Sequence, residues 1–222
     1  MAVDKPQLVV LISGSGSNLQ AFIDAIGDGS LNANIALVIS NRADAFGLQR
    51  AAAAGIATAT IAHSDYPSRE AFDAELIATI DRHRPDAVIL AGFMRILTAG
   101  FVNHYLGRLL NIHPSLLPLY PGLHTHQRAL DNGDREAGST VHFVTAELDG
   151  GPAIIQARVP VDGDDAASLA AKVLIEEHRI YPLATAWLLS GRLAMRGDRA
   201  LLDRRTLADG GVQLLAGETL PA

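Results

Sequence analysis

An amide and an imidazole stand two residues apart in the segment Leu110–Pro118, which reads LNIHPSLLP. Side chains at positions i and i+2 of a strand point to the same face, so Asn111 and His113 can aim at one point. A carboxylate, Asp149, follows where another apparent strand ends in a glycine loop. An amide donor, a titratable ring and a carboxylate are the groups needed to stabilise an oxyanion and move a proton. We interpret these three residues as a candidate catalytic group.

The loop Ser13–Asn18, which reads SGSGSN, is a second candidate site. Its glycines allow a ligand to approach the backbone, and the free N–H groups of a following helix attract an anion. It is not the dinucleotide fingerprint, because Leu19 occupies the third glycine position and the second strand ends in Ser40-Asn41 without an acidic residue. No Gly-Lys-Ser/Thr follows, which excludes a P-loop. A phosphomonoester site is favoured, and the alternative is a tight capped turn.

The segment Ala91–Leu97, which reads AGFMRIL, follows the fourth predicted strand. Ligands of open α/β sheets bind at the carboxyl ends of the strands, so this segment could line a slot for a flat heterocycle. Taken alone, the apolar residues Phe93, Ile96 and Leu97 are more typical of the hydrophobic core than of a ligand-binding slot.

The histidines raise the alternative of a metal site. His124 and His126 have i, i+2 spacing, and His113 and His142 could join them. The chain has no His-Glu-x-x-His motif and no cysteine, so zinc is disfavoured. A structural role for His124, His126 and His142, donating to backbone or capping a turn, is the favoured interpretation.

Strands and helices alternate along the first half of the chain. We predict strands at residues 7–12, 35–40, 58–61, 87–90 and 108–112, and helices at residues 18–26, 46–54 and 68–83. This order predicts an α/β fold with a doubly wound, mostly parallel, Rossmann-like sheet. Strands 139–143 and 153–159 have no helix between them, which predicts an antiparallel C-terminal part of the sheet. A long helix is expected at residues 166–189.

The composition narrows the class of protein. The chain has 222 residues, of which 49% are hydrophobic and 19% charged, enough for a sizeable core. It has no membrane-length apolar run and no signal-peptide pattern. The lack of cysteine fits a cytoplasmic protein, and a net charge of −6 without a basic run argues against nucleic acid. We expect one domain at residues 1–190 and a C-terminal extension of unassigned function at residues 191–222.

The motifs together resemble those of the phosphoribosylglycinamide formyltransferase family, the folate-dependent glycinamide ribonucleotide transformylases. The resemblance runs from about residue 7 to 190 and is carried by the segments Ser13–Leu19, Ala91–Leu97, Asn111–His124 and Glu147–Pro152. It implies a formyltransferase fold and transfer of the formyl group of 10-formyltetrahydrofolate to the amine of 5-phosphoribosylglycinamide, in de novo purine biosynthesis. It implies no metal.

The resemblance also implies roles for single residues. The catalytic residues are His113, Asn111 and Asp149; the folate is held by Arg69, Met94, Arg95, Ile96, Leu97 and Asn111; the ribonucleotide is held by Gly16, Ser17, Asn18 and Glu177. A pair of glutamates in a helix, such as Glu176–Glu177, is usually part of a solvated face, and periodicity alone gives no reason to single out either residue. Leu119 departs from some relatives, where a basic residue is expected.

Three alternatives stay open beside this interpretation. A methionyl-tRNA formyltransferase would add a C-terminal barrel, and a formyltetrahydrofolate hydrolase would add an N-terminal regulatory domain. A catalytically silent phosphate-binding module is the alternative outside this enzyme class. We expect small-molecule substrates, no membrane partner, and a monomer or homodimer. The sequence leaves the isomer of the Leu117-Pro118 bond undecided.

Overall fold

The computed structural model describes residues 5–221, and the chain divides after Leu110 into two compact units. The first unit is built on four parallel strands in the order β4-β1-β2-β3. These strands are β1 (Gln7–Ile12), β2 (Asn34–Ser40), β3 (Thr58–Thr60) and β4 (Ala87–Leu90). The predicted alternation of strands and helices is therefore confirmed, with β3 one residue shorter than expected.

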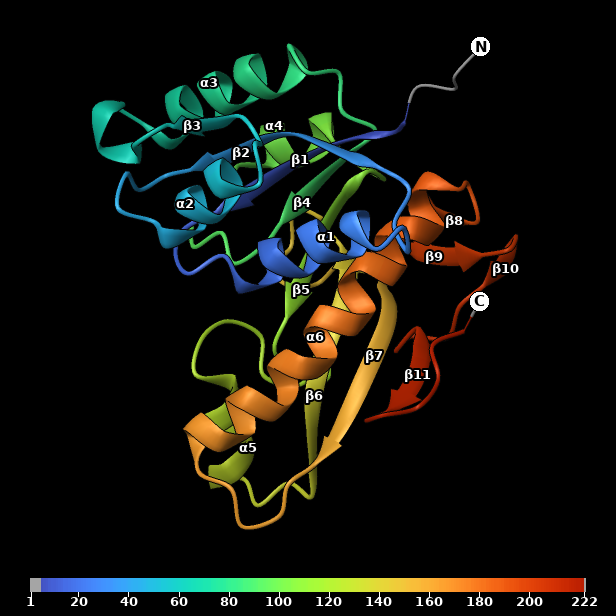
Figure 1. The fold of residues 1–222 in the computed structure, drawn as a ribbon. Helices are drawn as coiled ribbons and strands as arrows, with labels where there is room; N and C mark the ends of the chain where they lie inside the picture. The colour runs from blue at the N-terminus through green and yellow to red at the C-terminus, as the bar shows by residue number, and fades with distance from the viewer. Residues whose placement is uncertain (1–4, 222) are drawn as a thin grey trace. The chain divides into compact units, whose positions relative to one another are not determined.

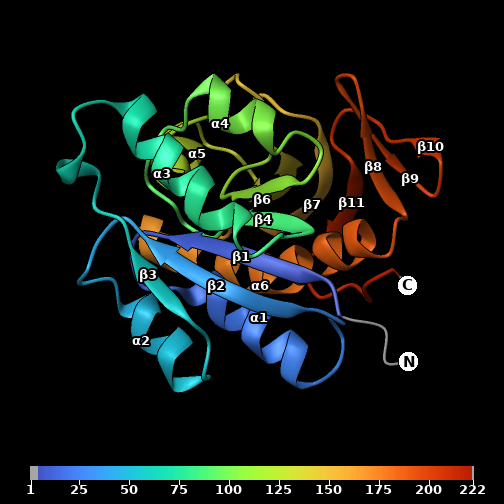
Figure 2. The same ribbon diagram turned by 90° about the horizontal axis from the view of Figure 1, so that it is seen from above.

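Helices cover both faces of these strands. Figure 2 shows α1 and α2 on one side of the first unit's strands and α3 and α4 on the other. The helices are α1 (Ser17–Gly27), α2 (Phe46–Ala53), α3 (Arg69–Asp81) and α4 (Ala99–His104), with a short 3-10 turn η1 (His63–Asp65). Because no face of β1 meets solvent, its residues from Leu8 to Ile12 are fully buried, which explains their uninterrupted apolar run.

Side-chain caps set where two of these helices begin. The hydroxyl of Ser68 accepts a hydrogen bond from the backbone N–H of Ala71 at the start of α3. The hydroxyl of Thr98 does the same for Phe101 at the start of α4. The sequence analysis did not predict α4, because its six residues are too few to show a helical period.

The second unit combines an antiparallel pair of strands with a long helix. Its strands follow the order β5-β6-β7-β11, with β6 and β7 antiparallel and β11 parallel to β7. They are β5 (Leu109–His113, whose last three residues belong to this unit), β6 (Glu136–Phe143), β7 (Ala153–Pro160) and β11 (Val212–Leu215). The antiparallel C-terminal part of the predicted fold is thereby confirmed.

Helix α6 (Ala166–Leu189) packs against β6 and β7, as Figure 1 shows. Asp165 and Ser168 form a reciprocal capping box at its start. Leu169 and Val173 of this helix are fully buried, and they share a cluster with Ala129 of α5 (Thr125–Asp131). The sequence analysis did not predict α5, which follows a loop rich in proline and glycine.

The segment after α6 is more regular than its composition indicates. It contains the small antiparallel sheet β10-β9-β8 and then β11. The first three are β8 (Leu193–Arg196), β9 (Arg199–Leu202) and β10 (Arg205–Thr206). A turn at Asp203 and Arg204, both with left-handed backbone angles, joins β9 to β10. Strands of two to four residues are too short to show an alternating pattern, so the sequence indicated only an irregular tail.

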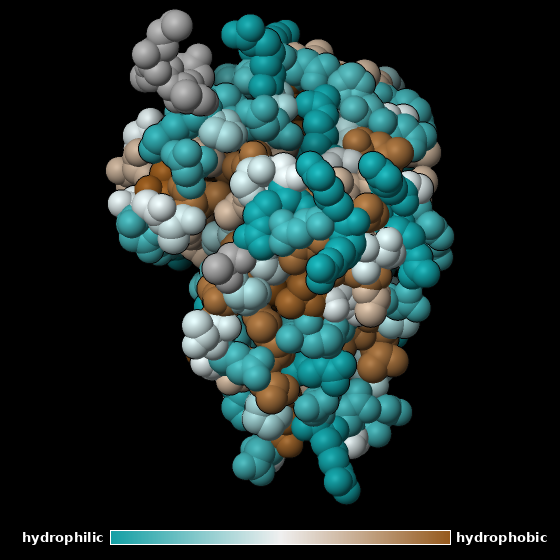
Figure 3. Space-filling model, turned by 90° about the vertical axis from the view of Figure 1, so that its right-hand side faces the viewer, coloured by the Kyte–Doolittle hydropathy of each residue, from teal (hydrophilic) through white to brown (hydrophobic). Residues whose placement is uncertain are grey.

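Figure 3 shows one face of the molecule, on which hydrophilic and hydrophobic side chains are interspersed. None of the helices within residues 5–221 combines the length and the apolarity needed to cross a membrane.

Candidate active site

The structure brings the imidazole of His113 to the carboxylate of Asp149. His113 is the last residue of β5, and Asp149 lies in the loop between β6 and β7. The distance from Nδ1 to Oδ2 is 3.5 Å, and both side chains are at least nine-tenths buried. The structure thus places a titratable ring and a carboxylate side by side within the second unit.

Local backbone geometry fixes the position of Asp149. The residue has a left-handed conformation with φ of 51°, and Gly150 and Gly151 follow it. A Cβ at Gly151 would stand 1.8 Å from the carbonyl oxygen of Phe143, so only glycine fits there. The loop therefore turns tightly against the end of β6 and presents the carboxylate inward. One carboxylate oxygen also accepts the backbone N–H of Gly122 at 2.9 Å.

Both ring nitrogens of His113 face oxygen acceptors. Nε2 donates to the carbonyl of Tyr120 at 2.9 Å, while Nδ1 faces Asp149. Neutral imidazole carries one N–H and imidazolium carries two, so only the protonated ring donates to both oxygens. Tyr120 has a left-handed backbone with φ of 55°, and its hydroxyl donates to Asp134 at 2.7 Å. An imidazolium at this position would have an oxygen acceptor near each of its two N–H groups.

Asn111 is held by a histidine that sequence reasoning assigned only a structural role. Its Nδ2 donates to Nε2 of His142 at 3.1 Å. The Nδ1–H of His142 donates to the carbonyl of Phe143 at 2.9 Å, as expected for a structural histidine. Burial lowers the pKa of His142 to about 4, so at neutral pH its Nε2 is a lone-pair acceptor. This contact fixes which end of the Asn111 amide is the nitrogen.

The other two histidines of the metal alternative behave differently. His124 precedes α5 with a left-handed backbone, and its side chain makes no cap hydrogen bond. Nδ1 of His126 is buried without a hydrogen-bond partner. Burial lowers the pKa of this ring, and the nearby His113 lowers it further by a smaller amount. Within residues 5–221, no three or more His, Cys, Asp or Glu side chains are grouped to hold a metal ion.

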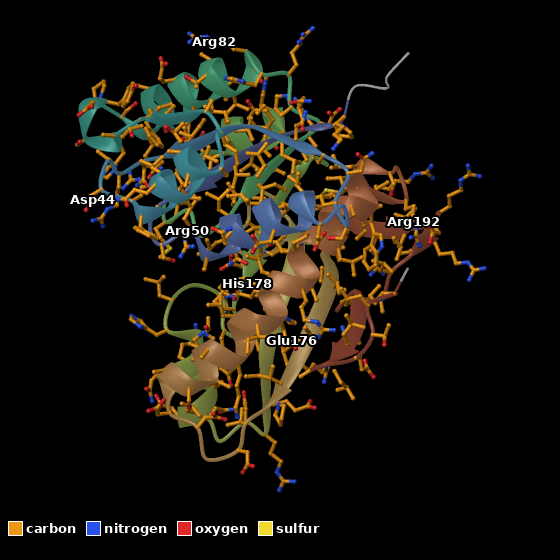
Figure 4. All side chains as sticks on the ribbon, viewed as in Figure 1. Asp44, Arg50, Arg82, Glu176, His178 and Arg192 are labelled. Atoms are coloured by element: carbon orange, nitrogen blue, oxygen red, sulfur yellow. The ribbon has the colours of Figure 1, made fainter. Side chains whose placement is uncertain are left out.

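In the first unit, the loop Ser13–Asn18 joins β1 to α1. Gly16 has φ of 70°, and a Cβ there would lie 2.6 Å from Cα of Gly47, so two backbones touch at this point. Arg50 of α2, labelled in Figure 4, donates from Nε to the carbonyl of Ser15 at 2.9 Å. The loop is thus held rigidly, with the first N–H groups of α1 behind it.

A hydrogen bond that the sequence did not predict connects two candidate segments of this unit. The hydroxyl of Ser13 donates to Oδ1 of Asn41 at 2.6 Å and accepts the backbone N–H of Met94 at 2.8 Å. The residues Met94 to Leu97 therefore start beside the phosphate-loop candidate. Met94 is 64% exposed and Ile96 is 63% exposed. The core interpretation is therefore wrong for Ile96.

Two residues of α3 contact the end of this segment. Arg69 donates to the carbonyl of Leu97 at 3.4 Å, a long contact, so the two predicted folate residues lie together. The buried carboxylate of Asp73 accepts the N–H of Thr98 at 2.6 Å. Arg95 and Leu97 are half-buried. The segment is thus a loop tied down at both ends with apolar side chains exposed between them.

The glutamates of α6 are buried, so the solvated-face interpretation is wrong. Glu176 is 4% exposed and Glu177 is 7% exposed. Glu176, labelled in Figure 4, accepts a 2.5 Å contact from Arg179 and the backbone N–H of Gly217. In α6, the buried Val173 lies three and four residues before these glutamates, which places all three on one face. That spacing was the signal in the sequence from which the burial of the two glutamates could have been predicted.

The Leu117-Pro118 peptide bond, whose isomer the sequence left undecided, is cis.

Comparison with known proteins gives a consistent result. Residues 6–185 match the family model described as formyl transferase. The chain is 59% identical to phosphoribosylglycinamide formyltransferase of Escherichia coli K12, over 92% of this chain and 97% of that protein. A solved phosphoribosylglycinamide formyltransferase of Coxiella burnetii, in complex with CHES, is 49% identical with a TM-score of 0.92, covering 95% of this chain and 100% of that one.

A longer relative matches only in part. The trifunctional purine biosynthetic protein adenosine-3 of Drosophila melanogaster is 50% identical over 84% of this chain, and the chain covers 14% of that protein.

Proposed function

This chain belongs to the formyl transferase family, and from that premise we propose that it transfers a formyl group from 10-formyltetrahydrofolate to the amine of 5-phosphoribosylglycinamide. The reaction is a step of purine biosynthesis. The near full-length similarity to an enzyme of that name supports this choice of substrates. The single observation that carries the chemistry is the buried pairing of His113 with Asp149.

The reaction begins when the substrate amine attacks the formyl carbon and negative charge develops on the formyl oxygen. Asn111 has two N–H groups on Nδ2; one is donated to His142, and we assign the other to the oxyanion. Protonated His113 supplies a second, charged donor from Nε2. In the structure this N–H donates to the carbonyl of Tyr120, which holds the ring in position until the oxyanion replaces that carbonyl as the acceptor. The exchange is favourable because a charged acceptor makes the stronger hydrogen bond.

Asp149 stabilises the imidazolium through Nδ1 while Nε2 serves the substrate. The tetrahedral intermediate then loses a proton from the attacking nitrogen and gains one on the folate nitrogen. Cleavage of the bond between the formyl carbon and that folate nitrogen releases tetrahydrofolate. His113 or a water moves the proton between the two nitrogens. Because the amine is itself the nucleophile, the proposal involves neither a covalent enzyme intermediate nor a metal.

We assign substrate binding to the residues that the family resemblance implies. Gly16, Ser17 and Asn18 hold the ribonucleotide phosphate with the N–H groups at the start of α1. Glu177 holds the substrate amine. The folate is held by Arg69, Asn111 and the segment Met94–Leu97, whose exposed Met94 and Ile96 offer apolar contact to a flat ring. All these assignments are proposals that rest on the family resemblance and on the local geometry described above.

The experiment that tests this function mixes the purified chain with 10-formyltetrahydrofolate and 5-phosphoribosylglycinamide and follows the folate absorbance. Formylation of the amine, lost in His113→Ala, is the expected result. Release of formate with water as the only acceptor would identify a formyltetrahydrofolate hydrolase instead. Formylation of methionyl-tRNA, or phosphate-ligand binding without any turnover, would identify one of the other two alternatives.

We further propose that the enzyme works on small molecules alone, without nucleic acid or a membrane, as a monomer or homodimer. Synthesis of a purine precursor from these substrates would place it in the cytoplasm. Sedimentation of the purified chain alone measures its oligomeric state. Sedimentation with tRNA or with lipid vesicles tests the two expected absences, since co-sedimentation with either would contradict the proposal.

A further inference from the structure

The loop Pro114–Tyr120 carries the carbonyl that orients His113. Within it the N–H of Leu119 donates to the carbonyl of Leu116 at 3.0 Å, but the N–H and the carbonyl of Leu117 bond only to side chains outside the loop. The N–H of Ser115 donates to the carbonyl of His113 at 2.9 Å, and the hydroxyl of Ser115 donates to the carbonyl of Leu119 at 2.6 Å. The middle of the loop must be held from outside. What holds it therefore affects where the carbonyl of Tyr120 meets the catalytic ring.

Thr140 of β6 supplies the first external contact. Its fully buried hydroxyl donates to the carbonyl of Ser115 at 2.7 Å and accepts the N–H of Leu117 at 3.0 Å. It also accepts a hydrogen bond from Nε2 of Gln156 at 3.0 Å. One donor and two lone pairs are all that a hydroxyl has, so every site on this oxygen is used.

Gln156 of β7 is the next residue in the network. Its side chain is 3% exposed, and Nε2 donates both to the carbonyl of Leu117 at 2.7 Å and to Thr140. Both N–H groups are therefore used by the loop and its support. Its Oε1 accepts from Nε2 of Gln213 at 3.2 Å. A flip of this amide would set one oxygen against another, so the orientation is determined by its neighbours.

Gln213 lies on the C-terminal strand β11, beyond the part of the chain that the family model matches. Parallel pairing of β11 with β7 places Gln213 opposite Gln156 in register. Its amide is fixed at both ends, since Oε1 accepts from Arg158 at 3.0 Å and Nε2 donates to the carbonyl of Gly210 at 2.7 Å. The tail strand thus presents an oriented donor to the buried network.

The tail is also anchored to the helix that carries Glu177. The backbone N–H of Gly217 donates to Glu176, and Arg179 donates to both Glu176 and the carbonyl of Glu218. A Cβ at Gly211 would lie 2.4 Å from the backbone of Ile154, so the segment entering β11 is in close contact with β7. The C-terminal strand is therefore an integral part of the second unit.

We infer that β11 belongs to the positioning machinery of the enzyme: through Gln213, Gln156 and Thr140 it fixes the loop whose Tyr120 carbonyl orients His113. The inference rests on the function proposed above, because it assigns these three residues to the same reaction. We assign no substrate contact to any of them, and their hydrogen bonds lead to the active site through the loop. Loosening this network lowers turnover while leaving substrate affinity unchanged.

Two variants test the inference. Thr140→Val keeps the branched shape and removes the hydroxyl; Gln213→Glu keeps the length and removes the donor to Gln156 at an exposed position. We expect kcat to fall on the order of 10-fold in Thr140→Val and about threefold in Gln213→Glu, with both KM values unchanged. Thr140→Ser, which restores the hydroxyl, recovers most of the activity. Gln49→Glu, the same chemical change on exposed α2, is the matched control and leaves kcat at the wild-type value.

A spectroscopic measurement separates this inference from the function itself. In ¹⁵N-histidine-labelled protein, the Nε2–H resonance of His113, identified by its loss in His113→Asn, reports the bond to Tyr120. We expect this resonance to move upfield or vanish by exchange in Thr140→Val and in Gln213→Glu. If both variants only lower the melting temperature, with kcat and the resonance unchanged, the inference is wrong and the function stands. If the wild type transfers no formyl group, the function fails, and the resonance still decides whether β11 positions His113. If Thr140→Val does not fold, Gln213→Glu decides the matter alone.

Discussion

His142 accepts a hydrogen bond from the Asn111 amide as a neutral, fully buried ring. This relationship links a buried ring to the amide that we assign to the oxyanion. It also makes stability depend on pH, because the ring titrates differently in the folded and unfolded chain.

The first prediction concerns that pH dependence. Burial lowers the folded-state pKa of His142 to about 4 from the ordinary histidine value of 6.5, so the unfolded chain binds the proton more readily. Its contribution to stability is complete above pH 6.5 and is lost as the pH falls toward 4, by roughly 3 kcal/mol in total. We expect His142→Gln, which cannot titrate, to flatten the dependence of the unfolding free energy on pH between 6.5 and 4. Urea denaturation at several pH values measures it, with exposed His63→Gln as the control; an unchanged slope in His142→Gln would contradict the assignment.

The second prediction concerns the catalytic pair. His113→Ala removes the donor that we propose for the oxyanion, and Asp149→Asn removes the carboxylate paired with it. We expect kcat to fall by about 10²–10³ in each variant, with substrate dissociation constants changed little. Single-turnover kinetics and equilibrium titration of each substrate measure the two effects separately. Near wild-type turnover in both variants would end the assignment of these residues as catalytic.

The third prediction concerns the phosphate loop. In Gly16→Val, the new Cβ would lie 2.6 Å from the Cα of Gly47. The backbone of residue 16 also has a left-handed φ, which valine rarely adopts. We expect ribonucleotide affinity to fall by at least about tenfold, because the loop must move away from the helix start. Calorimetry with each substrate measures this, and folate binding should persist. Gly14→Ala is the matched control, since a Cβ there meets nothing within 4 Å. Equal ribonucleotide affinity in Gly16→Val would contradict the proposed site.

The fourth prediction concerns the buried carboxylate of α6. Glu176→Gln removes the negative charge that forms a salt bridge with Arg179 and accepts a hydrogen bond from the N–H of Gly217. We expect a loss of about 1–3 kcal/mol in unfolding free energy, since a buried partner is left with a weaker acceptor. Chemical denaturation measures the loss, and Glu75→Gln, on partly exposed α3, serves as the comparison. A stability equal to wild type would show that the Arg179 contact contributes nothing.

The proximity of His113 and Asp149 could be expected because local geometry determines much of it. Asn111 and His113 lie on one face of one strand, and a glycine loop after a strand is the ordinary place for Asp149. His142 was recognised only as structural, because its partnership with Asn111 depends on how neighbouring strands β5 and β6 align. Register between strands far apart in sequence is set by packing and cannot be read from either strand alone.

The same limit explains what the sequence did not predict in the tail. Strand β11 (Val212–Leu215) is only four residues long. Its place beside β7 depends on the close contact between the backbones of Gly211 and Ile154, which no periodicity in the sequence reveals. Ser13 was part of a recognised loop, yet its bond to Met94 joins two segments that only the sheet brings together. The burial of Glu176 and Glu177 is different, since the spacing from Val173 already indicated it.

The close approach of Gly151 to the carbonyl of Phe143 limits how this enzyme can be redesigned. Mutant libraries aimed at new acceptor amines should keep residues 150 and 151 constant, because almost every clone altered there would lose the turn that delivers the carboxylate. Leu148, 58% exposed in the same loop, offers a nearby position where diversity is tolerated.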